Sequence, residues 1–77
     1  MTWMSFDTVD AAAFALVDLE SGSRVGAAHL RSQVRALLRQ SREEEPDRLA
    51  FLVVVAVDDM GQEIESWSAP EILGATA

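Results

Sequence analysis

The sequence predicts a small α+β domain in which one or two amphipathic helices pack on an antiparallel sheet. Three features lead to this prediction: an uninterrupted apolar stretch at residues 49–57, a half-polar segment that follows a turn at residues 58–61, and an Arg-rich helical pattern at residues 23–42. A chain of 77 residues has room for one domain, spanning residues 1–77. We expect residues 1–6 and 69–77 to be loosely ordered.

The stretch LAFLVVVAV at residues 49–57 is expected to form the centre of the sheet. β-Branched Val side chains suit a pleated strand, and the lack of polar alternation indicates apolar surroundings on both faces. We therefore predict an inner strand. Asp58 to Gly61 would turn the chain into a second strand at residues 62–68, which completes a hairpin over residues 49–68.

The segment before the first glycine fits two structures. Asp7 as an N-cap, Asp10 in the first turn and Gly22 as a stop signal predict a helix that includes residues 11–20. The alternative is a strand at residues 14–20 that turns at Gly22 into a hairpin. We favour the helix because its start and stop signals agree with each other.

Residues 23–42 show the clearest helical pattern in the chain. At about 100° per residue, Leu and Val side chains gather on one arc, which is typical of a buried stripe. The Arg side chains of this segment gather on a neighbouring arc of about 80°. This Arg stripe consists of Arg24, Arg31, Arg35, Arg39 and Arg42. The Glu run before Pro46 predicts the end of the helix.

The Arg stripe has two interpretations. It would bind an anionic partner such as an acidic protein, because a planar guanidinium makes two parallel hydrogen bonds to a carboxylate. Alternatively, it is a solvated flank whose guanidinium groups pair with the chain's own acids. Trp3 and Trp67 are the aromatic candidates for partner recognition, with core packing as their alternative role.

Acidic residues dominate the charge of the chain. Thirteen Asp and Glu against six Arg give a formal net charge of −7, which argues against direct binding of nucleic acid. The acidity suggests a different hypothesis, in which carboxylates mimic phosphates and block a nucleic-acid-binding protein, although such clusters also occur as solvated loops. The mimicry candidates are Glu43, Glu44, Glu45, Asp47, Asp58, Asp59, Glu63 and Glu65.

No pattern in the sequence indicates catalysis, a cofactor or a metal site. The chain has no Cys or Lys nucleophile and no Gly-rich phosphate-binding loop. His29 has no second ligand at metal-binding spacing, so a surface position is expected. Residues 58–63 lack the alternating oxygen ligands of a calcium loop, so we predict a plain turn there.

The function expected from these features is that of a small accessory or regulatory protein without enzymatic activity, acting through protein–protein contacts. Its apolar surplus for so short a chain favours a homodimer. The longest apolar run, nine residues, is too short for a bilayer, so we expect a cytoplasmic protein, and the Lys-free, Ala- and Arg-rich composition suits a bacterial or phage gene. The alternative function is an acidic inhibitor or antitoxin-like protein that occupies a nucleic-acid-binding partner.

Overall fold

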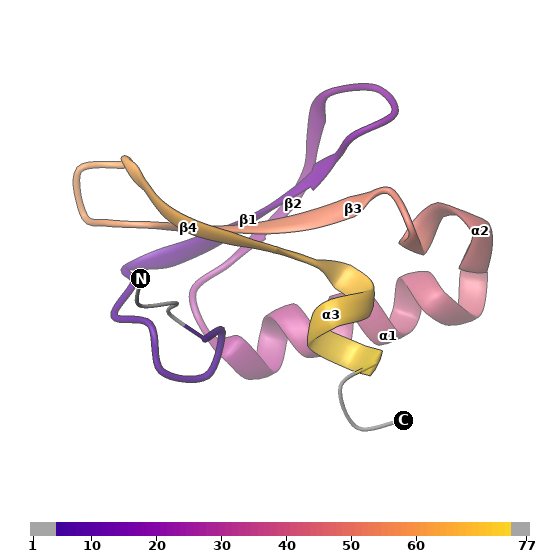
Figure 1. The fold of residues 1–77 in the computed structure, drawn as a ribbon, viewed down its shortest axis with the longest axis horizontal. Helices are drawn as coiled ribbons and strands as arrows, with labels where there is room; N and C mark the ends of the chain where they lie inside the picture. The colour runs from indigo at the N-terminus through magenta and orange to yellow at the C-terminus, as the bar shows by residue number, and fades with distance from the viewer. Residues whose placement is uncertain (1–4, 75–77) are drawn as a thin grey trace.

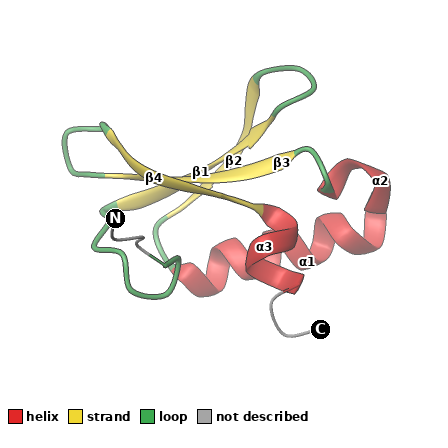
Figure 2. Ribbon diagram, viewed as in Figure 1, coloured by secondary structure: helices red, strands yellow, loops and turns green. Residues whose placement is uncertain are grey.

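A four-stranded antiparallel sheet carries helices on one of its faces in the computed structural model, which describes residues 5–74 (Figure 1). Figure 2 shows the two layers, with the strands above and the helices below. The predicted α+β class is confirmed. The elements are β1 (Ala13–Asp18), β2 (Ser23–Ala28), α1 (Arg31–Glu44), α2 (Pro46–Leu49), β3 (Leu52–Val57), β4 (Glu63–Ser68) and α3 (Ala69–Gly74).

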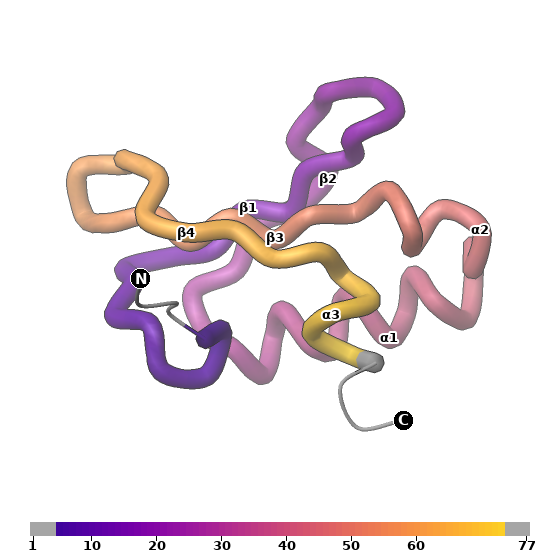
Figure 3. Tube along the Cα trace, viewed as in Figure 1, coloured from indigo at the N-terminus to yellow at the C-terminus, as the bar shows by residue number. Residues whose placement is uncertain are grey.

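The strand order is β2-β1-β3-β4, with β1 and β3 in the centre. Because β2 and β3 both pair antiparallel with β1, they run parallel to each other and need a crossover connection. The chain makes this crossover through α1, which runs back beneath the sheet from the end of β2 (Figure 3). Val54 pairs with Leu16 on one side and with Trp67 on the other, which confirms β3 as an inner strand.

The prediction of a helix at residues 11–20 is wrong, and the alternative prediction of a hairpin is correct. The segment forms β1 and turns into β2 through Gly22, whose φ of 73° suits glycine. Asp7 caps no helix and pairs instead with Arg35. The apolar residues of β1 alternate between the two sheet faces, and its pairing with both neighbouring strands outweighs the helix propensity of its Ala residues.

The helix expected at residues 23–42 begins later and is preceded by a strand. Residues 23–28 form β2, and α1 starts at Arg31, where the Gln33 side-chain oxygen accepts a hydrogen bond from the Leu30 backbone N–H at 3.1 Å. The predicted end before Pro46 is confirmed. The central strand is shorter than expected, because Leu49 is the last residue of α2.

The core lies between the sheet and α1. Leu16, Leu52 and Val54 project from the central strands onto Val34 and Leu38, both of which are fully buried. This alternation of buried and less buried residues along β3 follows the two-residue period of a strand.

Both ends of the described chain contribute to this core. The Phe6 ring packs 5.2 Å from the Phe14 ring and 5.5 Å from the Trp67 ring. Ala69 is fully buried, and α3 packs against α1 and the end of the sheet. Phe6 and α3 thus pack against the rest of the domain, whereas residues 1–4 and 75–77 lie outside the described residues, and the expectation of loosely ordered ends stays a prediction.

The turn between β3 and β4 is the plain turn that the sequence predicts. The Asp58 carboxylate accepts hydrogen bonds from the backbone N–H groups of Met60 and Gln62, each at 2.9 Å. Gly61 adopts a φ of 81°, in the left-handed region. The Asp58 side chain thus stabilises the hairpin locally.

We predict that Phe6→Ala lowers the free energy of unfolding by about 3–5 kcal/mol, because it removes the ring that joins Phe14 and Trp67. Urea denaturation followed by circular dichroism measures this change. Leu30→Ala is the control: its side chain is 59% exposed, and we expect a change within about 0.5 kcal/mol. Equal losses in the two variants would contradict the packing of the N-terminal segment.

Candidate interaction surfaces

The sheet face opposite the helices is rich in apolar residues, and no helix or further strand of residues 5–74 packs on it (Figure 1). Alternation along β1 and β3 places one set of apolar side chains on the face that the helices cover and the other set on this open face. The open face is formed by Ala13, Ala15, Val17, Leu19, Phe51, Val53, Val55 and Val57. The second apolar cover that the sequence leads us to expect for β3 is therefore not supplied within the described chain.

Val55 occupies the centre of the open face. It pairs with Ala15 on β1 and with Ser66 on β4, and Ala15 in turn pairs with Ala27 on β2. These side chains are short, so this row forms a flat surface across the four strands. Phe51, which is 43% exposed, and Leu19, which is 61% exposed, extend the face at one end. Exposed apolar side chains gathered on one face are typical of an interaction site.

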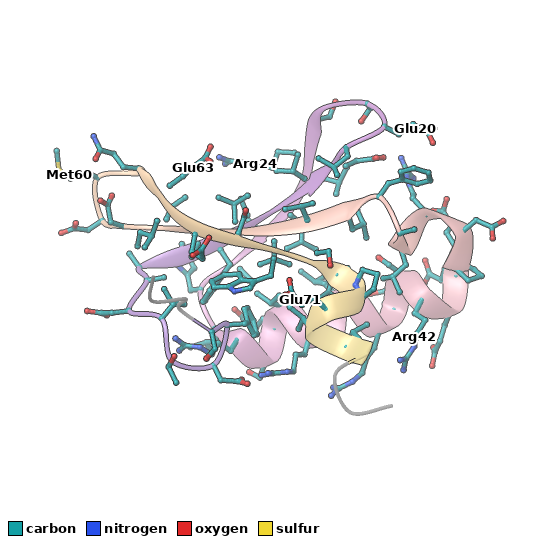
Figure 4. The ribbon with its side chains drawn as sticks, viewed as in Figure 1. Glu20, Arg24, Arg42, Met60, Glu63 and Glu71 are labelled. Carbon is teal, nitrogen blue, oxygen red and sulfur yellow. The ribbon has the colours of Figure 1, made fainter. Side chains whose placement is uncertain are left out.

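Opposite charges border the open face on its two edge strands. Arg24 extends from β2 and Glu63 from β4, both on the side of the sheet away from α1 (Figure 4). Neither residue forms an ion pair within residues 5–74. One edge of the open face is thus positive and the other negative.

The Arg stripe is not a single helical surface. Arg24 lies on β2 and is separated from the others by the turn before α1, so this part of the prediction is wrong. Arg31 donates hydrogen bonds to the backbone carbonyls of Phe6, at 2.7 Å, and of Val9. These bonds fasten the N-terminal segment to α1.

Arg35 is also engaged within the chain. It pairs with the Asp7 carboxylate, and its guanidinium carbon lies 4.9 Å from the centre of the Phe6 ring. Arg35 thus pairs with an acid of the chain, as the alternative interpretation describes, whereas Arg31 binds backbone carbonyls, which neither interpretation describes. Arg39 and Arg42 are exposed and make no ion pair with another described residue.

The two Trp candidates have different outcomes. Trp67 is 8% exposed and lies edge-on to the Phe6 ring in the core, which is the alternative position that the sequence analysis gives for it. Its position on β4 directs the side chain towards the helices. Sequence alternation alone does not decide which face of an edge strand is buried. Trp3 lies outside the described residues.

The acidic mimicry candidates divide into two groups. Residues 43–47 lie where α1 meets α2, before β3, whereas Asp58 and Asp59 lie in the hairpin after β3. The six residues of β3 separate these groups by about 20 Å. Glu65 is half-buried on β4, and Glu63 borders the open face. The candidates therefore form no single acidic surface, and the mimicry hypothesis stays a prediction.

The sequence analysis missed an ion pair at the end of β1. The Asp18 carboxylate, in a residue that is 2% exposed, accepts hydrogen bonds from Arg48 Nε at 3.1 Å and from the Glu20 backbone N–H at 2.9 Å. The Glu20 bond and the Arg48 guanidinium lower the pKa of Asp18, against the effect of burial. Asp18 in turn raises the pKa of Arg48. A lone acid at the end of an apolar strand was the available sequence signal.

This ion pair links β1 to α2. Arg48 also contacts the Glu45 carboxylate at 3.4 Å, so its guanidinium is shared between two acids. Because the groups with displaced pKa values satisfy each other, the pair acts as a structural tie.

Within residues 5–74, no group of three or more His, Cys, Asp and Glu side chains is arranged to hold a metal ion, and no helix has the length and apolarity needed to cross a membrane. His29 is exposed, as expected. Comparisons with protein-family models, curated proteins and solved structures found no significant match.

We predict that the stabilising effect of Asp18 depends on pH. Its pKa is lowered in the folded state from the ordinary value of 3.8, so its contribution is complete above that pH and is lost as the pH falls through the folded-state pKa. Asp18→Asn should therefore lower the urea midpoint at pH 7 and have a much smaller effect at pH 2.

Asp59→Asn is the matched control, because Asp59 is exposed in the hairpin. It should leave the urea midpoint nearly unchanged at both pH values. If Asp18→Asn shifts the midpoint equally at pH 7 and pH 2, then the charge of Asp18 does not stabilise the fold.

We predict that Arg31→Gln lowers the free energy of unfolding by about 1–3 kcal/mol, because the carbonyls of Phe6 and Val9 lose their charged donor. Arg39→Gln removes the same charge from an exposed position of α1 and should cost no more than about 0.5 kcal/mol. Thermal denaturation of both variants measures the difference. Equal effects of the two variants would show that the hydrogen bonds of Arg31 do not stabilise the fold.

Proposed function

We propose that this chain is a small non-catalytic accessory or regulatory protein of the cytoplasm, which acts through protein–protein contacts and works as a homodimer. The observation that supports this proposal is the open face, a sheet surface rich in apolar residues on which no helix or further strand of residues 5–74 packs. In a small domain, leaving half-buried Val side chains on such a face forgoes stabilisation that a second layer would supply.

The charges at the borders of the open face favour a second copy as that layer. In a two-fold, face-to-face pair whose axis runs diagonally across the strands, the two sheets cross at a steep angle. Arg24, in the row of Val17 and Val53, and Glu63, in the row of Val57, lie at opposite corners of the open face, and this axis exchanges the two corners. Arg24 of each copy would then approach Glu63 of the other, and the two ion pairs would flank the apolar centre. A contact of this type closes on itself and yields a dimer rather than a polymer.

The described ionisable groups support a role without catalysis. The two side chains with displaced pKa values, Asp18 and Arg48, are paired with each other at the end of β1. The runner-up function, mimicry of nucleic acid by the acidic residues, has weaker support because those residues lie in two separate groups.

The proposal predicts that the wild type has twice the monomer mass of 8.4 kDa in light scattering coupled to size exclusion. Val55→Glu places a charge at the centre of the open face and should give a monomer that keeps its helical circular dichroism signal. Ser32→Glu adds the same charge on the exposed side of α1 and should remain dimeric.

A charge exchange tests the orientation of the dimer. Arg24→Glu and Glu63→Arg should each weaken the dimer, because each places like charges opposite one another, and the double variant should restore it. A wild type that is monomeric at low micromolar concentration, or a dimer that persists in Val55→Glu, would refute the proposed dimer.

A further inference from the structure

A groove runs between β2 and α1, on a part of the molecule distinct from the open face. β2 is an edge strand, with β1 as its hydrogen-bonded neighbour, and α1 lies beneath it. Two adjoining hollows of about 440 and 240 Å³ make up the groove, and both are lined by Leu37 and Gln40. The first lies beside the end of β2 and the second beside its beginning.

The backbone of β2 is open to pairing along this groove. An edge strand presents unpaired N–H and C=O groups, which proteins usually protect with Lys or Pro. The sequence of β2, SRVGAA, contains neither; its one charged side chain, Arg24, lies near its beginning, beside the bulge opposite Leu16 and Val17, and residues 25–28 carry no charge. Ala27, Ala28 and Gly26 have little or no side chain, so another backbone has room to approach.

The side chains that line the groove suit the alternate residues of an extended peptide. Ala36 and Leu37 of α1 form its lower wall, and Val25, which is 50% exposed, lies at its upper border. A strand that adds to a sheet edge gains affinity from main-chain hydrogen bonds and specificity from alternate side chains in such pockets.

One end of the groove is acidic. Glu44 and Glu45 line it where β2 begins, and the neighbouring hollow adds Glu20 and Asp47. The cation at this end, Arg48, is already paired with Asp18 and Glu45. A peptide residue that reaches this end therefore meets a surplus of negative charge.

We propose that this groove binds an extended, apolar segment of a partner protein, which adds as a fifth strand next to β2 and places an Arg or Lys at the acidic end. The site rests on the proposed protein-interaction function, but it is centred on the edge of β2 and on α1, whereas the open face is centred on β1 and β3. It supplies the partner contact that the homodimer alone does not.

A second copy of this chain fits the groove less well. Two-fold pairing of β2 with itself would be antiparallel, so the beginning of the second β2 would lie beside the end of the first. Arg24 of the second copy would then lie near His29, at the opposite end from Glu44 and Glu45. A foreign peptide can place its basic residue at the acidic end.

The test is selection from a displayed library of random eight-residue peptides on the full chain. Wild type and Ala36→Arg, which fills the groove, are compared, and Ser32→Arg on the outer side of α1 is the control for the added charge. We expect peptides with alternating apolar residues and a basic residue near one end to bind wild type and the control. They should fail to bind Ala36→Arg.

One selected peptide is then synthesised and titrated by NMR against wild type, Glu44→Gln and the control Glu43→Gln. Shifts should fall on β2 and on Leu37 and Gln40, and Glu44→Gln should weaken binding by roughly two- to fivefold relative to Glu43→Gln. Two peptides are compared, one methylated at the odd and one at the even backbone nitrogens. Only one of them should lose binding, because only one of these two sets of N–H groups faces β2.

Several results would overturn the proposal: no peptide whose binding depends on Ala36, selected peptides without a basic residue, or shifts confined to the open face. Loss of the wild-type dimer in Ala36→Arg would assign the groove to a second copy instead. Repeating the titration with Val55→Glu separates the two proposals, because peptide binding should persist there even though the dimer is lost.

Discussion

The pairing of β1 with both β2 and β3 is the constraint on which the rest of the structure depends. It makes an Ala-rich segment with helix signals a central strand. It also makes β2 and β3 run parallel to each other, with β1 between them. Such strands need a crossover, which α1 provides beneath the sheet. A single helical layer on one face follows directly, and so do the apolar face opposite it and the exposed edge at β2.

Arginine illustrates how one residue type acquires different roles through its position. Arg31 and Arg35 fasten the N-terminal segment across α1, and Arg48 neutralises a buried carboxylate at the end of β1. Arg24 borders the open face opposite Glu63 on the other edge strand. Arg39 and Arg42 stay exposed on α1 without an ion pair among the described residues, whereas the groups that engage Arg31 and Arg35 come from a segment far apart in the chain.

The two proposed surfaces have different roles: the open face binds a second copy of the chain, and the groove beside β2 binds a partner protein. A sheet face binds by apolar packing and is satisfied by an identical face with reversed charges at its borders. A sheet edge binds by main-chain hydrogen bonds and accepts any extended segment whose side chains suit the groove beside it. Since they use different atoms of the same strands, both surfaces can be occupied in one assembly.

The sequence by itself determined the α+β class, the inner strand with its hairpin and turn at Asp58, and the end of the helix before Pro46. These features depend on short-range terms: β-branched runs, the conformational freedom of Gly61 and the restriction before proline. Only the tertiary structure decided that residues 13–18 are a strand, that Arg24 leaves the helix and that Trp67 is buried. Local signals at these positions fit two structures, and the choice comes from cross-strand pairing and from core contacts between residues distant in sequence. The ion pair of Asp18 with Arg48 is of the same kind, because thirty positions separate partners that meet only after the sheet has formed.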